Sequence, residues 1–262
     1  MAKILFPTDF SETANNAFLY ALNLAKVLKT NIKLVSVQSN LKNYLEVTEE
    51  NFENYINKLK NIAKENNLEH VKIESSLVVG DLLLMILDII NKEDIQYVVM
   101  GTNGQNSLGK KFFGSNTVNV INNSPAPVLV VPNNVKFKEE RNFAYATLFN
   151  QKEAKALSQM EEVTKRYDKL LNIVHVDDKS ITPQMLSVKK EWEEEYPEAM
   201  ITIEPSKDVE DGLINYCTKN NIDVLGVVHR ELSSFERLFT INHSQRLLSS
   251  ANVALLVFQE SK

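Results

Sequence analysis

The chain has 262 residues, of which 44% are hydrophobic and 24% charged, and its formal net charge is −5. This composition is typical of a globular protein, and the acidic balance argues against general nucleic-acid binding through phosphates. The single cysteine excludes an internal disulfide. No apolar run reaches the roughly 18 residues of a membrane span, and the opening residues lack the apolar core of a signal peptide. We therefore expect a cytoplasmic protein that binds neither nucleic acid nor membrane.

The first half of the chain alternates predicted strands with predicted helices. Apolar residues at three- and four-residue spacing predict the helices, Thr48 is a plausible cap for the second of them, and short apolar or alternating runs predict the strands. In chain order we expect a strand at 4–6, a helix at 12–29, a strand at 32–37, a helix at 48–65, a strand at 72–79, a helix at 81–91, a strand at 97–100, a helix at 115–121 and a strand at 128–131.

The second half repeats this order of elements. We expect a strand at 142–147, a helix at 151–167, a strand at 170–176, a helix at 182–196, a strand at 200–203, a helix at 209–220, a strand at 224–228, a helix at 243–248 and a strand at 254–258. The repeat predicts two domains, residues 1–135 and 141–262, joined by a linker rich in Asn and Lys. Because alternation implies parallel strands, the predicted class is α/β: two tandem doubly wound (Rossmann-like) domains, each with a mostly parallel five-stranded sheet.

Glycine is scarce in this chain, with seven residues, yet four of them lie in one predicted loop between a buried strand and a helix: Gly101, Gly104, Gly109 and Gly114. Glycine lets backbone N–H groups approach an anion with no Cβ in the way. The start of the following helix, near Ser115, offers unpaired N–H groups and the positive end of a dipole. Lys110 and Lys111 add positive charge, so the loop predicts phosphate binding.

Three interpretations of this loop compete. Residues 104–110 satisfy the first part of the P-loop pattern, but Lys111 replaces the Ser or Thr that would hold magnesium. In a second interpretation the glycines serve only turns. In the third interpretation, the loop resembles the motif of ATP-binding members of the universal stress protein family. That motif is Gly-x-x-Gly, nine further residues and then Gly-Ser, and this chain has it as Gly101-x-x-Gly104 and Gly114-Ser115. The opening Pro-Thr-Asp-Phe-Ser at 7–11 and the ending at 124–132 also resemble that family, so the chain looks like a tandem universal stress protein.

The resemblance implies ATP and Mg²⁺ as cofactors. It implies an adenine and ribose site formed by Pro7, Thr8, Asp9, Val37, Met100 and Gly101, and a phosphate site, with Mg²⁺ alongside, formed by Gly104, Gly114, Ser115, Asn116 and Thr117. Val37 would contact adenine through its backbone, and Asn116 replaces the small apolar residue common at that position. Asp9 also suits a helix N-cap, because Glu12 follows at the spacing of a capping box, and the two roles are compatible.

The second domain departs from the motif. The positions equivalent to Asp9, Gly101, Gly114 and Ser115 hold Leu148, Val228, Thr240 and Ile241. Because β-branched side chains replace bare backbone and Glu231 and Glu236 add negative charge, we predict no ATP binding there. His229 and His243 flank this degenerate loop, but without metal-ligand spacing they are interpreted as solvated. Trp192, within an acidic helical stretch, could mark a contact surface.

No catalytic motif or metal site is evident. The first domain has one histidine, His70, which is predicted to lie away from the site, so no general base is visible and ATP hydrolysis would be slow at most. We expect an ATP-binding stress-response or regulatory protein with one nucleotide site in the first domain. The alternative is an interaction scaffold of the same fold that does not bind nucleotide. The resemblance also implies that the two domains pair through their last strands and that the chain forms a homo-oligomer, a dimer of two-domain chains, with an unidentified protein partner.

Overall fold

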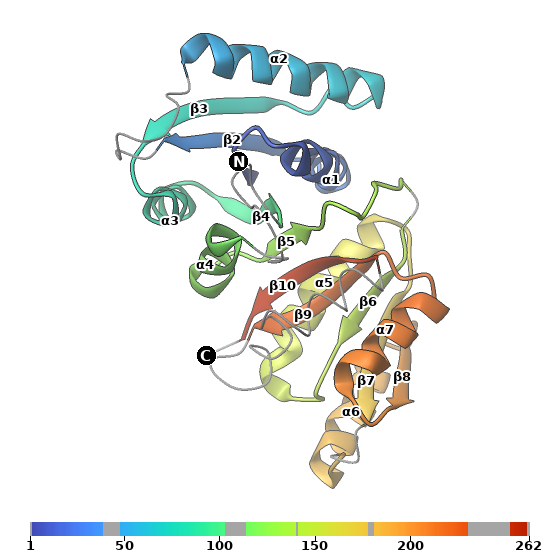
Figure 1. The fold of residues 1–262 in the computed structure, drawn as a ribbon. Coiled ribbons are helices and arrows are strands. Elements are labelled where there is room, and N and C mark those ends of the chain that lie inside the picture. Colours follow the sequence, from blue (N-terminus) through green and yellow to red (C-terminus); the bar gives the residue numbers. More distant parts are fainter. Residues whose placement is uncertain are drawn as a thin grey trace. The chain divides into compact units, whose positions relative to one another are not determined.

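The structure, a computed structural model, describes residues 2–38, 48–102, 114–139, 141–177, 181–229 and 252–260. The predictions for Gly104, Gly109, Lys110 and Lys111, and those for the helix at 243–248, Glu231, Glu236, Thr240, Ile241 and His243, lie outside these residues. The chain divides into two compact units, unit 1 at residues 1–137 and unit 2 at residues 138–262 (Figure 1).

Unit 1 is a parallel sheet with helices on both faces. Its described elements are β1 (Lys3–Pro7), α1 (Glu12–Leu28), β2 (Asn31–Gln38), α2 (Glu49–Glu65), β3 (Ile73–Val79), α3 (Leu82–Lys92), β4 (Ile95–Gly101), α4 (Ser115–Asn123) and β5 (Val128–Val131). The strand order is β3-β2-β1-β4-β5 and every pair is parallel. Helix α1 packs across β1, β4 and β5 and against α2, whereas α3 contacts β2, β4 and α4 (Figure 1). The order reverses between β1 and β4, and in such sheets a crevice opens at this point beyond the carboxyl ends of the strands.

Unit 2 repeats this architecture. Its described elements are β6 (Phe143–Ala146), the 3₁₀ turn η1 (Gln151–Glu153), α5 (Ala154–Arg166), β7 (Leu171–Asp177), α6 (Pro183–Glu195), β8 (Met200–Pro205), α7 (Val209–Lys219), β9 (Val224–His229) and β10 (Ala254–Gln259). The order is β10-β9-β6-β7-β8, again with every pair parallel. The predicted α/β class with two doubly wound, parallel-stranded halves is confirmed.

Local signals in the sequence explain where the helices begin. Thr48 caps α2 by accepting a hydrogen bond from the Asn51 backbone N–H at 3.1 Å, as predicted, and Asp81 caps α3 in the same way. The central strands β1 and β4 are mostly buried, as parallel strands covered on both faces are, and β5 is buried throughout, whereas β3 at the edge of the sheet is only half-buried. The contact surface considered as an alternative for Trp192 is not seen: Trp192 is 1% exposed and packs against Phe149, because it lies on the buried face of an otherwise acidic helix.

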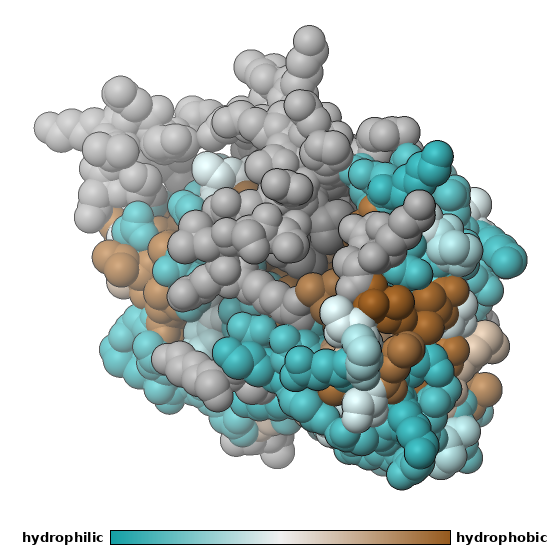
Figure 2. Space-filling view, turned by 90° about the horizontal axis from the view of Figure 1, so that it is seen from below, coloured by the Kyte–Doolittle hydropathy of each residue, from teal (hydrophilic) through white to brown (hydrophobic). Residues whose placement is uncertain are grey.

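In the part of the chain that the structure describes, no helix is both long and apolar enough to cross a membrane. Figure 2 shows a surface on which hydrophilic side chains surround separate hydrophobic clusters. The large apolar side chains that are exposed include Val79 and Leu84 in unit 1 and Leu148, Leu170, Leu186 and Met200 in unit 2.

Candidate functional site

The carboxyl ends of four neighbouring strands in unit 1 bring most of the predicted site residues to one edge of the sheet. Pro7 at the end of β1 is in register with Val35 of β2, and the Thr8 N–H donates to the Val35 carbonyl at 2.9 Å. Gly101 at the end of β4 is in register with Val131 of β5. Because all these strands are parallel, their ends lie at the same edge. The predicted residues at this edge are Pro7, Thr8, Asp9, Val37, Met100 and Gly101.

The turn between β1 and α1 has a tightly bonded backbone. The Thr8 hydroxyl accepts a hydrogen bond from the Phe10 N–H at 3.1 Å, and the Asp9 carboxylate accepts one from the Ser11 N–H at 3.2 Å. Phe10 has a φ of 65°, in the left-handed region that a bulky residue rarely adopts. Asp9 is exposed at the edge, while Thr8 beside it is buried.

Asp9 is not the N-cap of α1, so that part of the prediction is wrong. Ser11 is the cap: its hydroxyl accepts from the Ala14 N–H at 3.1 Å. The left-handed Phe10 delays the start of the helix by two residues relative to Asp9. The Asp9 carboxylate therefore closes the turn itself, as aspartate commonly does by bonding to the backbone two residues on.

The amino end of α4 lies directly beyond the end of β4. Gly114 is its N-cap, and the Gly114 N–H donates to the Thr102 carbonyl at 2.6 Å, which ties the helix start to the strand end. Glycine has no side chain with which to cap the helix, and Ser115 and Asn116 in the first turn are exposed. Thr117 is buried, and its hydroxyl donates to the Gly101 carbonyl at 3.1 Å. The Thr117 side chain therefore fastens α4 to β4.

Packing alone requires a glycine at position 101. A Cβ placed there would lie 2.7 Å from Thr13 Cγ2 and 3.2 Å from the Thr13 carbonyl oxygen. The first contact is closer than real Cβ atoms show, and the second, which is with the backbone of α1, is tighter than most real Cβ contacts. Gly101 thus allows α1 to cross the end of β4, which brings the β1–α1 turn close to the start of α4.

Helix α2 contributes a residue that the sequence did not point to. The Thr8 hydroxyl donates to the Tyr55 hydroxyl oxygen at 3.0 Å, and the Phe10 ring lies 4.6 Å from the Tyr55 ring, centroid to centroid. Burial raises the pKa of Tyr55 to about 12, so its hydroxyl is protonated at neutral pH. The sequence shows Tyr55 only as one member of the apolar stripe of α2, because its polar partner is 47 positions away.

The same turn recurs in unit 2 with different chemistry. The Thr147 N–H donates to the Val174 carbonyl at 2.9 Å, the Thr147 hydroxyl accepts from the Phe149 N–H at 2.7 Å, and Phe149 has a φ of 50°. Leu148 therefore stands where unit 1 has Asp9. The Thr147 hydroxyl donates to the Glu153 carboxylate, which is 1% exposed and also accepts from the Leu148 N–H.

The histidines do not form a metal site in the described residues. His70 is exposed just before β3, at the amino edge of the unit 1 sheet and thus opposite the predicted site. His175 is buried, with Nδ1 2.8 Å from the Thr147 carbonyl oxygen. Within the described ranges no group of three or more His, Cys, Asp or Glu side chains is arranged to hold a metal ion.

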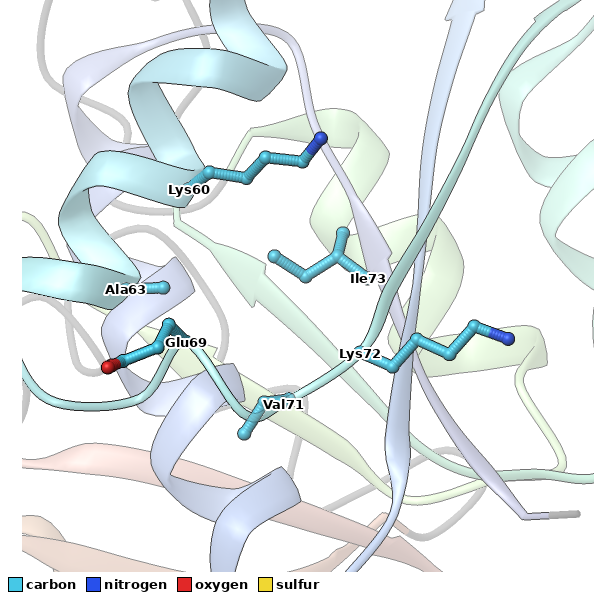
Figure 3. A pocket seen from close by; sticks show the side chains of 6 residues that line it. All are labelled: Lys60, Ala63, Glu69, Val71, Lys72 and Ile73. Carbon is cyan, nitrogen blue, oxygen red and sulfur yellow. The ribbon is translucent and has the colours of Figure 1, made fainter.

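A separate pocket lies on unit 1 between the end of α2 and the start of β3. It has a volume of about 300 Å³ and is lined by Lys60, Ala63, Glu69, Val71, Lys72 and Ile73 (Figure 3). Since β3 starts at Ile73, this pocket lies at the amino edge of the sheet. None of the predicted site residues lines it.

Comparison with known proteins identifies the relatives of the chain. Residues 1–132 match the universal stress protein family. Two universal stress proteins of Methanocaldococcus jannaschii are similar in sequence. One is 32% identical over 151 residues, covering 49% of this chain and 93% of the relative, and the other is 29% identical over 140 residues, covering 49% and 81%.

Likeness in structure extends over both units. The crystal structure of a universal stress protein from Archaeoglobus fulgidus superposes with a TM-score of 0.73 and covers 99% of this chain and 97% of its own, at 20% identity. At that identity the likeness concerns the fold alone. The family match over residues 1–132 and the 32%-identical relative together show that the chain belongs to the universal stress protein family.

Proposed function

We propose that unit 1 binds ATP, with Mg²⁺, at the carboxyl edge of its sheet, and that the chain acts as a stress-response or regulatory protein with one nucleotide site. The observation that carries this proposal is the start of α4. Gly114 is the N-cap of α4 and is the third glycine of a pattern that starts at the end of β4: Gly101-x-x-Gly104, nine further residues and Gly114-Ser115. This pattern resembles the motif of ATP-binding members of the family. A helix start of this kind presents backbone N–H groups and a positive dipole end to an anion.

The remaining residues of the proposed site divide by the part of the nucleotide they would meet. Ser115 and Asn116, exposed in the first turn of α4, and the backbone N–H of Thr117 would face the phosphates, together with Gly104 and Gly114. The adenine and ribose would lie against the ends of β1, β2 and β4. The residues proposed there are Pro7, Thr8, Asp9, Val37, Met100 and Gly101.

The oxygen atoms at this edge suit magnesium as the counter-ion of a nucleotide. Mg²⁺ prefers oxygen ligands, keeps several waters and is commonly held by substrate phosphates with only one or two protein groups. The exposed Ser115 hydroxyl, beside the proposed phosphates, is such a group. The bound ion would neutralise phosphate charge, and the chain's own part would be to orient the phosphates on α4.

Release of bound nucleotide is the first test of this proposal. The purified chain is denatured and the released small molecules are identified by mass spectrometry, and binding of ATP with Mg²⁺ is measured by calorimetry. We expect adenine nucleotide at up to one molecule per chain. No released nucleotide, together with no heat of binding at millimolar ATP, would leave the interaction scaffold as the better account.

Gly114→Val tests the phosphate end of the site. Gly114 has φ −65° and ψ 150°, an extended conformation that valine adopts readily, so the fold should persist while the side chain blocks close approach of phosphate. We expect ATP binding to be lost. The matched control is Gly80→Val, just beyond the carboxyl end of the outermost strand β3 and not among the proposed site residues; its added Cβ meets the flexible Met85 side chain at 3.1 Å, and binding should be retained.

A further inference from the structure

We infer that Tyr55 is a positioning residue for the nucleotide site: its hydroxyl and ring fix the turn at residues 8–10 and thereby set the direction of the Asp9 carboxylate. This inference rests on the proposed function, because Asp9 matters only if a ligand meets it. Tyr55 belongs to α2, 46 positions beyond Asp9 in the sequence, and is 7% exposed.

The turn needs an external support because its backbone is strained. Phe10 has a φ of 65°, a region that is costly for a bulky side chain. Such a conformation persists only where the surrounding structure over-determines it. The Thr8 N–H is bonded to β2, and the Ser11 hydroxyl is bonded within α1, so the ends of the turn are fixed by the sheet and by the helix. The support at its centre comes from α2.

Two hydrogen bonds connect the centre of the turn to α2 in series. The Phe10 N–H donates to the Thr8 hydroxyl at 3.1 Å, and the same hydroxyl donates to the Tyr55 oxygen at 3.0 Å. A hydroxyl has one proton to donate, so giving it to Tyr55 leaves the lone pairs of Thr8 for the Phe10 N–H. Bonds in such a chain strengthen one another in a buried setting.

Aromatic packing adds a second support from the same helix. The Phe10 ring lies 4.6 Å from the Tyr55 ring and 6.2 Å from the Phe52 ring, both in tilted arrangements. Phe52 and Tyr55 are three residues apart and therefore share one face of α2. Ring contacts and the hydroxyl together hold Phe10 in its left-handed conformation.

Asp9 lies between the two residues that α2 holds. Its carboxylate accepts from the Ser11 N–H at 3.2 Å and is exposed at the carboxyl edge of the sheet. With Thr8 and Phe10 fixed on either side, the backbone of Asp9 has little freedom. Because Tyr55 is protonated at neutral pH, it adds no negative charge near Asp9 and the proposed phosphates.

In unit 2 the threonine hydroxyl of the equivalent turn also has a side-chain acceptor. There the Thr147 hydroxyl donates to Glu153, which comes from the η1 turn directly after β6. Unit 1 takes its acceptor instead from a distant helix and uses a neutral tyrosine. The exchange keeps a second carboxylate away from the edge at which a phosphate anion is proposed to bind.

Tyr55→Phe is the central variant, because it removes the hydroxyl and keeps the ring. We expect the Kd for ATP with Mg²⁺ to rise about fivefold, the effect of one hydrogen bond. Thr8→Val should also raise the Kd. Thr8→Ser keeps a hydroxyl, so its Kd should equal that of the wild-type chain. The matched control is Tyr20→Phe: Tyr20 is 1% exposed in the same unit, but its hydroxyl donates to the Lys136 carbonyl, and the Kd should be unchanged.

A double-mutant cycle with Asp9→Ala separates positioning from general stability. If Tyr55 acts through Asp9, Tyr55→Phe should change the Kd by less than about twofold once Asp9 is alanine. The inference is overturned if the wild-type chain binds ATP and Tyr55→Phe binds equally well, if Tyr20→Phe weakens binding as much, or if the loss persists in full in the Asp9→Ala background. A wild-type chain that binds no ATP overturns the proposed function instead, and the role of Tyr55 with it.

Discussion

A Cβ on Gly101 would lie 2.7 Å from Thr13 Cγ2 and 3.2 Å from the Thr13 carbonyl oxygen, which belongs to the backbone of α1. A backbone group within a helix cannot give way as a flexible side chain does. We therefore predict that Gly101→Ala lowers the free energy of unfolding by about 1–3 kcal/mol, the usual effect of overpacking. Urea unfolding, followed by circular dichroism in the absence of nucleotide, measures it.

Two further variants control this prediction. Gly80→Ala places its Cβ 3.1 Å from Met85 Cγ, and because that side chain is flexible we expect no loss of stability. Thr13→Ser removes the Cγ2 atom, so it should recover part of the loss in the Gly101→Ala background. If Gly101→Ala and Gly80→Ala have the same stability, close packing does not explain the glycine at position 101.

The sequence identified Gly101 and Asp9 as important but not the contacts that each makes. Glycine clustering singled out Gly101 as a place where backbone approaches something, and the approach seen in the structure is that of α1. Sequence pattern puts the N-cap of α1 at Asp9, two residues too early, because nothing in local propensity predicts a left-handed Phe10. Tyr55 was not foreseen, since its role depends on a tertiary hydrogen bond to Thr8.

At the scale of secondary-structure elements, a cluster of charged side chains joins β1, β2, β3 and the α3–β4 connection at the amino edge of unit 1. Lys3 Nζ lies 2.8 Å from Glu74 Oε2 and 2.7 Å from Glu93 Oε2, and Lys33 Nζ lies 3.3 Å from Glu93 Oε1. The hydrogen bonds from Lys3 lower the pKa of both glutamates, and the same bonds raise the pKa of Lys3. These side chains are 19–31% exposed.

The direction of these pKa shifts predicts how stability depends on pH. Because the folded pKa values of the glutamates lie below their unfolded value of about 4.3, their contribution is fully present above that pH and is lost as the pH falls through the lowered values. The contribution of Lys3, whose pKa is raised, is present below its unfolded value of about 10.4 and is lost only at higher pH. Without Lys3, the pKa values of Glu74 and Glu93 should move back toward their unfolded value, so less stability is lost when they are protonated. We therefore predict that the unfolding free energy of Lys3→Met falls less between pH 7 and pH 3 than that of the wild type.

Urea unfolding at the two pH values measures this difference. The control is Lys58→Met, which removes the pair with Glu12; because those side chains are 51% and 88% exposed, water screens the pair and the pH dependence should be unchanged. A Lys3→Met chain that loses as much stability toward pH 3 as the wild type would show that the cluster does not govern acid stability.

Most elements were predictable from the sequence to within about two residues, since local signals set their ends. Thr48 caps α2 as expected, and Val128–Val131 forms β5 as its apolar run predicts. The helix predicted at 151–167 begins instead with a 3₁₀ turn, η1, before α5. Asn150 caps that turn through its side chain, and the buried Glu153 is turned back toward Thr147, a contact that periodicity cannot reveal.

At the scale of the whole molecule, the same fold occurs twice with chemically different carboxyl edges. Unit 1 presents an exposed Asp9 beside a tyrosine-supported turn, whereas unit 2 presents Leu148, 42% exposed, beside the buried Glu153. The Glu153 carboxylate accepts from the Thr147 hydroxyl and the Leu148 N–H, so both of these donors are already occupied. The repeated order of elements predicts two copies of one fold, which the structure has, and Leu148 in place of Asp9 predicts that the two copies differ in binding.

This asymmetry predicts that ATP with Mg²⁺ protects only one of the two edges. In hydrogen exchange of the full chain, saturating nucleotide should slow the exchange of backbone amides at residues 8–11 and 115–117. It should leave residues 147–150, the equivalent turn of unit 2, unchanged. Binding adds protection only where the ligand is held, because local opening must then release the ligand as well. The Gly114→Val chain is the control and should show no protection at either edge. Equal protection of both turns, or two nucleotides bound per chain, would contradict the assignment of a single site to unit 1.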